Sequence, residues 1–378
     1  MEKLPYGRQY IDGDDINDVI KVLRSNFITQ GPKIDEFESK LADYCGSKFA
    51  VTFNSGTSAL HGAYFALGLE KGQEMITSPN TFVSTSNAAL YLGAKPVFSD
   101  VEIETGNIDV LKVENKINEK TKLVVPVHYS GNPVKLKELH EITEKHGLDM
   151  IEDAAHAIGA NYGGKIIGSC QYSSMAIFSF HPVKHITTGE GGAVLTNDED
   201  YYERLMMFRS HGISKDHFSN KSDGDWYYEM KYLGYNYRMT DIQAALGLSQ
   251  LKKLKEFVKR RRKIARIYEE TFVGNPYFQT INCNNNESSY HLFSILLNDE
   301  YKNKKSKIFI KLKDEGLGVQ VHYIPVYLHP YYKNLGYKPG SCPVAEDFYQ
   351  REISIPIYPA MSDEDVDNVI KILLKVFK

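Results

Sequence analysis

The chain has 378 residues, of which 42% are hydrophobic and 25% charged, ordinary proportions for a globular protein. Its 45 Lys and Arg residues and 48 Asp and Glu residues give a net charge of −3, which argues against a protein built to bind nucleic acid. The four cysteines form no CxxC pair, the start of the chain has no apolar signal region, and no apolar run is long enough to span a bilayer. We therefore expect a cytoplasmic protein with no disulfide framework, no metal site and no membrane partner.

The first two-thirds of the chain alternates short apolar runs with helical patterns. The apolar runs predict strands at residues 49–53, 74–78, 95–101, 122–129, 148–153, 174–180 and 191–197. Helical spacing between several of these runs predicts helices at residues 57–68, 83–93 and 135–147. Such alternation is typical of an α/β fold in which helices cover both faces of a mostly parallel sheet.

The pattern changes after about residue 200. Helices are predicted there at residues 200–209, 240–271, 305–315 and 363–377, and strands at 289–297 and 317–325. This mixture indicates a smaller C-terminal α+β domain, joined to the first by the long helix. We therefore divide the chain into a large domain, residues 1–250, and a small domain, residues 251–378.

Three polar features follow predicted strands. "FNSGTSAL" ends a strand and opens a helix, so Gly56 and Thr57 lie at a helix N-terminus, where an anion is favoured. Asp153 ends another strand, at the edge where open α/β sheets bind their ligands. Lys184 lies just past a third strand, in a turn that Pro182 imposes. Taken singly, the Gly56–Thr57 segment is equally typical of an ordinary capped helix start, and Asp153 is equally typical of a helix cap.

One cofactor chemistry needs all three features together. An enzyme that uses pyridoxal phosphate needs a lysine for a Schiff base, a carboxylate that keeps the pyridine nitrogen protonated, and a helix N-terminus with hydroxyl groups for the phosphate. Ser179, five residues before Lys184, supplies one such hydroxyl. An aromatic ring often covers this cofactor, and Phe82 follows a predicted strand at the same edge, although core packing explains Phe82 equally well.

Six motifs resemble, in order and spacing, those of the DegT/DnrJ/EryC1/StrS family of sugar-nucleotide aminotransferases. They are "FNSGTSAL", "SPNTFVSTSNAALYLGAKPVFSDV", "IEDAAHAIGA", "FSFHPVKHITTGEGGAVLTND", "FRSHGI" and "GYNYRMTDIQAALGLSQL". The resemblance runs from about Tyr6 to the C-terminus. It implies a fold-type I aminotransferase that works as a homodimer with active sites at the subunit interface. Some family members have His in place of the cofactor-binding lysine and act as dehydratases, whereas this sequence keeps Lys184 and resembles the transaminases.

The resemblance also implies roles for individual residues. Lys184 would bind pyridoxal phosphate, Asp153 would pair with the pyridine nitrogen, Phe82 would lie against the ring, and His156 would sit near the cofactor hydroxyl. The phosphate would be held by Gly56, Thr57 and Ser179, with Asn236 reaching in from the partner subunit. The N-terminal segment and two further stretches would contact the nucleotide sugar, through Tyr6, Asn26, Phe27, Ile28, Thr29, Gln320, Val321, His322 and Tyr323.

Within the family, the sequence most resembles the transaminases of pseudaminic acid biosynthesis. The resemblance implies L-glutamate as amino donor and a UDP-linked 4-keto-6-deoxy sugar as acceptor. Basic side chains should meet the diphosphate, and Arg238, Lys33 and His322 are candidates that the sequence does not rank. Two alternatives stay open, namely a different nucleotide-sugar 4-aminotransferase, of the perosamine, bacillosamine or 4-amino-arabinose type, and a catalytically idle sugar-nucleotide-binding regulator on the same fold.

Overall fold

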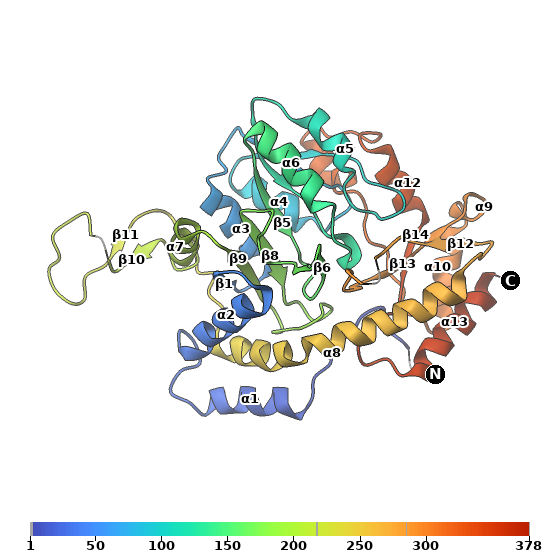
Figure 1. Cartoon of the computed structure of the whole chain (residues 1–378), viewed down its shortest axis with the longest axis horizontal. Helices are drawn as coiled ribbons and strands as arrows, with labels where there is room; N and C mark the ends of the chain where they lie inside the picture. The colour runs from blue at the N-terminus through green and yellow to red at the C-terminus, as the bar shows by residue number, and fades with distance from the viewer. Residues whose placement is uncertain (1–2, 217, 285, 378) are drawn as a thin grey trace.

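A seven-stranded sheet forms the centre of the larger part of the molecule (Figure 1). The computed structural model describes residues 3–216, 218–284 and 286–377. In sheet order, the strands are β1 (Phe49–Phe53), β9 (Gly192–Thr196), β8 (Met175–Ser179), β5 (Asp149–Asp153), β4 (Thr121–Val125), β2 (Glu74–Thr77) and β3 (Lys95–Phe98). Neighbouring strands are parallel except that β9 runs antiparallel to both β1 and β8. The predicted α/β fold with a mostly parallel sheet is confirmed.

Helices cover both faces of this sheet. On β1, Ala50 packs in one core and Val51 in the other, because successive residues of a strand point to opposite faces. The core that contains Ala50 also contains residues of α2 (Pro32–Cys45), α6 (Leu136–His146) and the first part of α8 (Asp241–Phe272). The core that contains Val51 includes residues of α3 (Gly56–Leu67), α4 (Ser84–Tyr91) and α7 (Glu199–Phe208). Helices therefore cover both faces of the sheet, as the sequence predicts.

The C-terminal part of the chain forms a second region around a three-stranded antiparallel sheet. Its strands lie in the order β12 (Phe278–Thr280), β13 (Phe293–Leu297) and β14 (Glu352–Ile355). Its helices are α9 (Asp299–Lys302), α10 (Lys305–Asp314), α11 (Pro330–Asn334), α12 (Pro343–Arg351) and α13 (Asp363–Phe377). The long helix α8 runs beneath the larger part and into this second region (Figure 1).

Helix α8 changes partners along its length. Its earlier apolar residues, up to Val258, belong to the core of the larger part, and those from Ile264 onward belong to the core of the second region. The division of the chain at residue 250 stays a prediction, and we propose that the boundary lies further along α8, between Val258 and Ile264.

The prediction of a strand at 317–325 is wrong. Instead, the strand that pairs with β13 is β14, which the sequence analysis missed together with β12. The 317–325 stretch makes isolated bridges at Leu317 and Gln320, and side chains bind its backbone groups further on. The predicted strand at 289–297 begins at Phe293 instead, because the N–H groups of Ser289 and His291 donate to carbonyls of the 130–131 loop.

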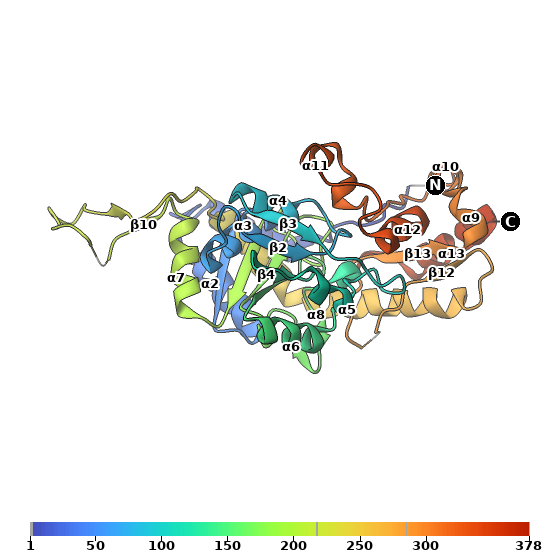
Figure 2. The ribbon, with the colours of Figure 1, turned by 90° about the horizontal axis from the view of Figure 1, so that it is seen from above.

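The remaining described helices are α1 (Gly13–Leu23), α5 (Val110–Val113) and three single turns at Glu114–Lys116, Tyr129–Gly131 and Val326–Leu328. The remaining strands are β6 (Asn161–Tyr162), β7 (Lys165–Ile166), β10 (Ile213–Ser214) and β11 (Glu229–Met230). The hairpin β10–β11 belongs to an arm that extends away from the body in both views (Figures 1 and 2). In the residues that the structure describes, no helix has the length and apolar character needed to cross a membrane.

A buried ion pair joins three elements of the larger part. Arg209, which ends α7, binds Glu38 of α2, and both side chains are buried. Glu38 also accepts hydrogen bonds from the N–H and hydroxyl of Thr52 on β1, each at 2.7 Å, and Arg209 donates to the Thr52 carbonyl at 2.9 Å. The pair is therefore surrounded by hydrogen bonds that offset part of its desolvation.

Replacing Arg209 by Met should leave the Glu38 charge buried without its cation. We expect Arg209→Met to lower the free energy of unfolding by about 3–5 kcal/mol, as for other buried pairs that lose one partner. Denaturant unfolding measures the change, and the exposed Arg24→Met is the matched control. The double variant Glu38→Gln/Arg209→Met should recover part of the loss, and a double variant no more stable than Arg209→Met would contradict this explanation.

Candidate active site

A cavity of about 820 Å³ opens at the carboxyl ends of the central parallel strands. This volume is in the range of pockets that bind cofactors and small substrates. Its walls come from the larger part of the molecule, from the N-terminal segment and from the 320–324 loop of the second region. The residues predicted from sequence that line it are Tyr6, Gly56, Thr57, Phe82, Asp153, His156, Ser179, Lys184, Gln320, Val321, His322 and Tyr323.

The N-terminus of α3 forms one end of the cavity. Ser55 caps the helix by accepting a hydrogen bond from the N–H of Ser58 at 3.1 Å, while the first N–H groups of a helix, here on Gly56 and Thr57, have no partner within it. A Cβ atom on Gly56 would lie 3.0 Å from Cβ and 3.2 Å from Oγ of Ser179. The absence of a side chain at Gly56 therefore lets the helix start and the Ser179 hydroxyl converge on one spot, which suits an anion.

Asp153 ends β5 and is buried in the wall of the cavity. Its carboxylate accepts hydrogen bonds from the hydroxyl of Thr85 at 2.6 Å and from the N–H of Ala155 at 3.2 Å. Burial raises the pKa of Asp153, and these two hydrogen bonds and the charge of Lys184 oppose the rise. The carboxylate thus lacks a cation in direct contact among the described residues, and a protonated ring nitrogen in the cavity would supply one.

Lys184 follows β8 and lines the same cavity. Burial lowers the pKa of its amine to about 8, although the nearby charge of Asp153 favours the ammonium form. Since the lowered pKa is close to neutrality, a substantial fraction of the amine is unprotonated in mildly alkaline solution. An amine of this kind can act as a nucleophile or as a base.

Phe82, His156 and Tyr323 line the same cavity. Phe82 is 59% exposed, so its ring faces the open cavity and is available to stack on a bound ring, which the sequence alone could not decide. The Nε2 atom of His156 lies 3.0 Å from the Tyr323 hydroxyl, and burial lowers the pKa of His156 far below its usual value. His156 is therefore neutral at physiological pH.

The loop that carries His322 and Tyr323 is held by side chains of both regions. The N–H of His322 donates to the Glu352 carboxylate at 2.8 Å, and the His322 carbonyl accepts a hydrogen bond from the Tyr129 hydroxyl at 2.7 Å. The N–H of Tyr323 donates to the side-chain oxygen of Asn80 at 3.1 Å. Burial lowers the pKa of His322 to about 3. A neutral His322 cannot neutralise a diphosphate, and this weakens its candidacy as a cation for the nucleotide.

Several residues predicted from sequence lie outside the cavity. The 26–29 stretch, with Asn26, Phe27, Ile28 and Thr29, connects α1 to α2, and its Phe27 and Ile28 side chains are more than half exposed. Asn236 lies at the base of the arm, where its carbonyl accepts a hydrogen bond from the Asn54 amide at 3.4 Å. Arg238 follows on the same segment, and Lys33 pairs with Glu36 at 2.6 Å on the surface. Their roles in substrate binding stay predictions.

The cavity also contains residues that the sequence analysis did not single out. His181, between Ser179 and Lys184, and Ile324, beside Tyr323, could have been found from their neighbours in sequence. Glu190 and His329 also line the cavity, and Thr85 binds Asp153, but no local pattern marks these positions.

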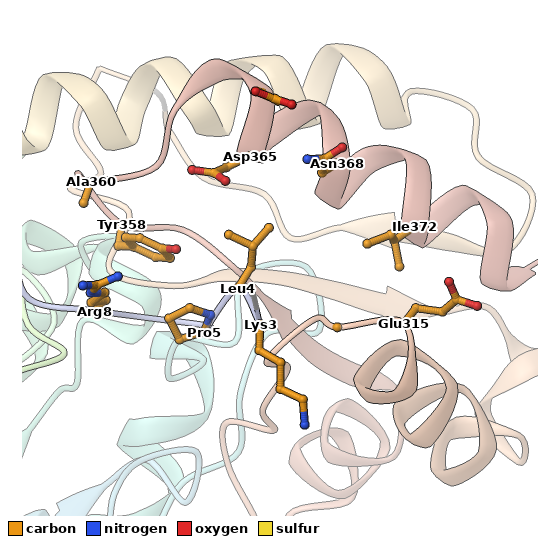
Figure 3. Close-up of a pocket in the computed structure, with 12 residues that line it drawn as sticks. Lys3, Leu4, Pro5, Arg8, Glu315, Tyr358, Ala360, Asp365, Asn368 and Ile372 are labelled. Carbon is orange, nitrogen blue, oxygen red and sulfur yellow. The ribbon is translucent and has the colours of Figure 1, made fainter. Parts of the chain in front are cut away.

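A second cavity, of about 360 Å³, is lined by the N-terminal segment and by residues of the C-terminal part of the chain (Figure 3). Neither Lys184 nor Asp153 is among the residues around it, so it is distinct from the candidate active site. The segment is anchored there by the Leu4 N–H, which donates to the Gly316 carbonyl at 3.0 Å. Tyr6 lies on the same segment but lines the large cavity. Figure 3 draws the residues of the second cavity, among them Lys3, Leu4, Pro5, Arg8, Glu315, Tyr358, Asp365, Asn368 and Ile372.

The large cavity fits pyridoxal phosphate. Its helix N-terminus and Ser179 are suited to the phosphate, its buried Asp153 needs a cation that the pyridine nitrogen supplies, and the Lys184 amine is available to the aldehyde. These groups lie on separate strand ends and converge at one edge of the sheet.

Comparison with known proteins agrees with this fit. The sequence profile of the DegT/DnrJ/EryC1/StrS aminotransferase family matches residues 9–374. The chain belongs to this family. It is therefore a pyridoxal-phosphate-dependent aminotransferase that acts on sugar nucleotides.

Three relatives match almost the whole chain. A protein of Methanocaldococcus jannaschii, MJ1066, is 45% identical and the alignment covers 99% of this chain and 97% of the relative. The spore coat polysaccharide biosynthesis protein SpsC of Bacillus subtilis is 41% identical, with the same coverage of 99% and 97%. The UDP-4-amino-4,6-dideoxy-N-acetyl-β-L-altrosamine transaminase of Campylobacter jejuni is also 41% identical, and 99% of each chain is covered.

Solved structures are similar along the full length. PseC of Helicobacter pylori, an aminotransferase of pseudaminic acid biosynthesis, superposes with a TM-score of 0.93 at 38% identity, covering 100% of this chain and 99% of that one. Spr1654 of Streptococcus pneumoniae, described as a sugar aminotransferase, has been solved in a pyridoxamine phosphate form (TM-score 0.93, 31% identity, 99% and 98% coverage) and also in a pyridoxal phosphate form. Both similarities support the aminotransferase fold, and the two forms of Spr1654 also support the cofactor.

Thr85 offers a test of the Asp153 environment. Thr85→Val keeps the shape of the side chain but removes the hydroxyl that stabilises the carboxylate, so the pKa of Asp153 should rise further. We expect the acidic limb of the pH profile of kcat/KM to move to higher pH by about one unit, the size of one charge-assisted hydrogen bond. Thr143→Val, at a buried threonine of α6, is the matched control and should leave the profile unchanged. An acidic limb that Thr85→Val does not move would contradict this assignment.

Proposed function

We propose that the enzyme transfers the amino group of L-glutamate to C4 of UDP-2-acetamido-2,6-dideoxy-β-L-arabino-hex-4-ulose. The products are UDP-4-amino-4,6-dideoxy-N-acetyl-β-L-altrosamine and 2-oxoglutarate, and the sugar serves pseudaminic acid biosynthesis and flagellin glycosylation. The observation that carries this proposal is the 41% identity, over 99% of both chains, with the Campylobacter jejuni transaminase of that name. The similarity to PseC of Helicobacter pylori supports it further.

The similarity to SpsC favours a second candidate within the same class. SpsC is equally identical to the chain and takes part in the biosynthesis of a spore coat polysaccharide. A different 4-keto sugar nucleotide, with the same amino transfer, is therefore the alternative that the experiment below has to distinguish.

Pyridoxal phosphate, when bound, supplies an aldehyde that takes up amino groups and a protonated ring that withdraws the electrons of the bond being broken. The side chains of this protein prepare that chemistry. The Asp153 carboxylate would hold the proton on the ring nitrogen, Phe82 would stack on the ring, and His156 would lie near its hydroxyl. Gly56, Thr57 and Ser179 would bind the phosphate.

Lys184 has two tasks in this proposal. Its amine would hold the cofactor in the resting enzyme, and the free amine would carry, at Nζ, the proton that moves during amino transfer. The second task needs the neutral amine for part of the cycle. With its pKa lowered to about 8 by burial, Lys184 exists in both forms near neutral pH.

We also propose a homodimer with shared active sites. The arm that carries β10 and β11 exposes large apolar side chains, which a monomer would leave in water. Their exposed fractions are 76% for Trp226, 57% for Tyr228, 64% for Met230 and 74% for Leu233. Burial against a second copy would remove this surface from water and bring Asn236, at the base of the arm, toward the partner's phosphate site.

Turnover of defined substrates tests the reaction. Purified enzyme with pyridoxal phosphate and L-glutamate should convert the UDP-linked arabino-4-ulose to the 4-amino sugar, identified by NMR. Other UDP- and dTDP-linked 4-keto sugars should react at least about tenfold more slowly, which corresponds to the net loss of about one hydrogen bond. Faster turnover of another 4-keto sugar would replace the proposed substrate while leaving the aminotransferase assignment in place.

Lys184→Ala is the control for the chemistry. It should bind sugar nucleotide but lose transamination, because no other amine takes its place. Asp153→Asn should retain cofactor and react slowly. Normal turnover by Lys184→Ala would contradict its role, and a wild-type protein that binds sugar nucleotide but never binds pyridoxal phosphate would favour the idle regulator.

Subunit mixing tests the shared sites. Lys184→Ala and Asn236→Asp should each be inactive as homodimers, the second because a carboxylate would repel the phosphate. In a mixed dimer, one of the two sites combines an intact Lys184 with an intact Asn236 from the partner. Random mixing should therefore restore about a quarter of the wild-type activity. Mixtures that stay inactive, after size measurements establish that subunits exchange, would contradict a shared site.

A further inference from the structure

A histidine of the second region contacts the catalytic lysine. Nε2 of His291 lies 3.4 Å from Nζ of Lys184, although the two residues are 107 positions apart in the chain. His291 is buried and lies two residues before β13. His291 therefore connects the second region directly to the amine of Lys184 in the larger part of the molecule.

His291 is packed among other imidazole rings. The ring centroid of His156 is 4.4 Å from that of His291, and the centroid of His185 is 5.6 Å from it. His156 binds Tyr323, and Nε2 of His185 lies 3.0 Å from the Ser289 carbonyl, so Lys184 is the hydrogen-bonding partner of Nε2 of His291. In the described part of the chain, no group of His, Cys, Asp or Glu side chains has an arrangement that would hold a metal ion, so the cluster is not a metal site.

The backbone of His291 is fixed from both sides. Its N–H donates to the Ser130 carbonyl at 2.8 Å. The buried guanidinium of Arg261, on α8, donates from one nitrogen to the carbonyls of Tyr290 at 3.1 Å, His291 at 3.2 Å and Ile357 at 2.9 Å.

The backbone next to His291 is also strained. Tyr290 has a φ of 49°, a left-handed conformation that is unfavourable for a bulky residue and persists only where the surroundings hold it. The contacts of Arg261 and Ser130 account for that constraint, and their result is that the imidazole of His291 faces Lys184.

We propose that His291 is a positioning residue for Lys184, which binds the lysine amine whenever that amine is not bonded to the cofactor, and that Arg261 holds His291 in place for this task. The inference rests on the proposed role of Lys184 as the cofactor-binding lysine. It adds to that role a partner that keeps the released amine at the reaction centre rather than free to rotate into the cavity.

The neutral state of His291 suits this task. Burial, together with the charge of Lys184, lowers the pKa of His291 far below its usual value, so its Nε2 accepts a hydrogen bond from the ammonium or donates one to the neutral amine. The bond to the ammonium is the stronger of the two, because it is charge-assisted. His291 therefore also favours the protonated amine. The other titratable groups that interact with Lys184 are Asp153, His156, His185 and His322, of which Asp153 favours the ammonium and the histidines remain neutral.

The pH dependence of the lysine's reactivity tests the proposal. The full-length protein, freed of cofactor, is mixed with pyridoxal phosphate over a range of pH, the adduct is trapped with borohydride, and the modified peptide is identified by mass spectrometry. His291→Phe should move the midpoint of Lys184 reactivity to lower pH by about one unit, because the ammonium loses a charge-assisted hydrogen bond. His291→Gln, whose amide can still bind the amine, should stay close to the wild-type midpoint. His61→Phe, at a buried histidine outside the cavity, is the matched control and should leave it unchanged.

Two results would overturn the role of His291, namely an unshifted midpoint in His291→Phe, or equal shifts in His291→Phe and His291→Gln. If His291→Phe does not fold, as judged by circular dichroism, the wild-type protein labelled with ¹⁵N-histidine decides. Its His291 Nε2 signal should then titrate with the Lys184 midpoint, and an Nε2 signal that does not move would overturn the proposal. Wild-type adducts at a lysine other than Lys184 would instead contradict the proposed function itself.

Discussion

The buried carboxylate of Asp153 is the constraint on which the candidate active site depends. A charge at this depth is unfavourable without a partner, and the residues that the structure describes supply it with two hydrogen bonds and the charge of the more distant Lys184 amine. The strand that carries Asp153 runs parallel to its neighbours, so the helix start at Gly56 and the turn at Lys184 meet it at the same sheet edge. The cavity is thus built to receive a cationic ring that is anchored at one end by a phosphate and at the other by an amine.

The second region supplies residues to the candidate active site that the central sheet does not provide. The loop with His322 and Tyr323 lines the cavity, and the buried His291 contacts Lys184, although all three residues come after α8 in the chain. Helix α8 packs in both cores and so connects the two regions, and Arg261 on this helix donates hydrogen bonds to the backbone of Tyr290 and His291. The position of the Lys184 amine is in this way coupled to the packing of the C-terminal part.

The sequence predicted the features that depend on local patterns. The strand ends at Asp153 and Lys184 follow from apolar runs bounded by polar residues, and parallel strands bring such ends together. Contacts between residues that are distant in the chain could not be predicted from these patterns. His291 and Thr85 carry no local signal, because their partners Lys184 and Asp153 are far away in the sequence. The 317–325 stretch is apolar enough for a strand, but side chains bind its backbone groups in place of a neighbouring strand.

The residues suited to the cofactor and those predicted to meet the sugar come from different elements of the fold, and this explains why the reaction class follows more directly than the substrate. The groups suited to the cofactor lie on the sheet edge of one chain, where strand order determines their geometry. The residues expected to meet the sugar nucleotide lie on the N-terminal segment, on the 320–324 loop, or, like those at 26–29 and Asn236, outside the cavity of their own chain. These segments are not strands of the central sheet, so their amino-acid sequence can vary without displacing Asp153 or Lys184. Family members can thus share one amino-transfer centre and still discriminate between sugars.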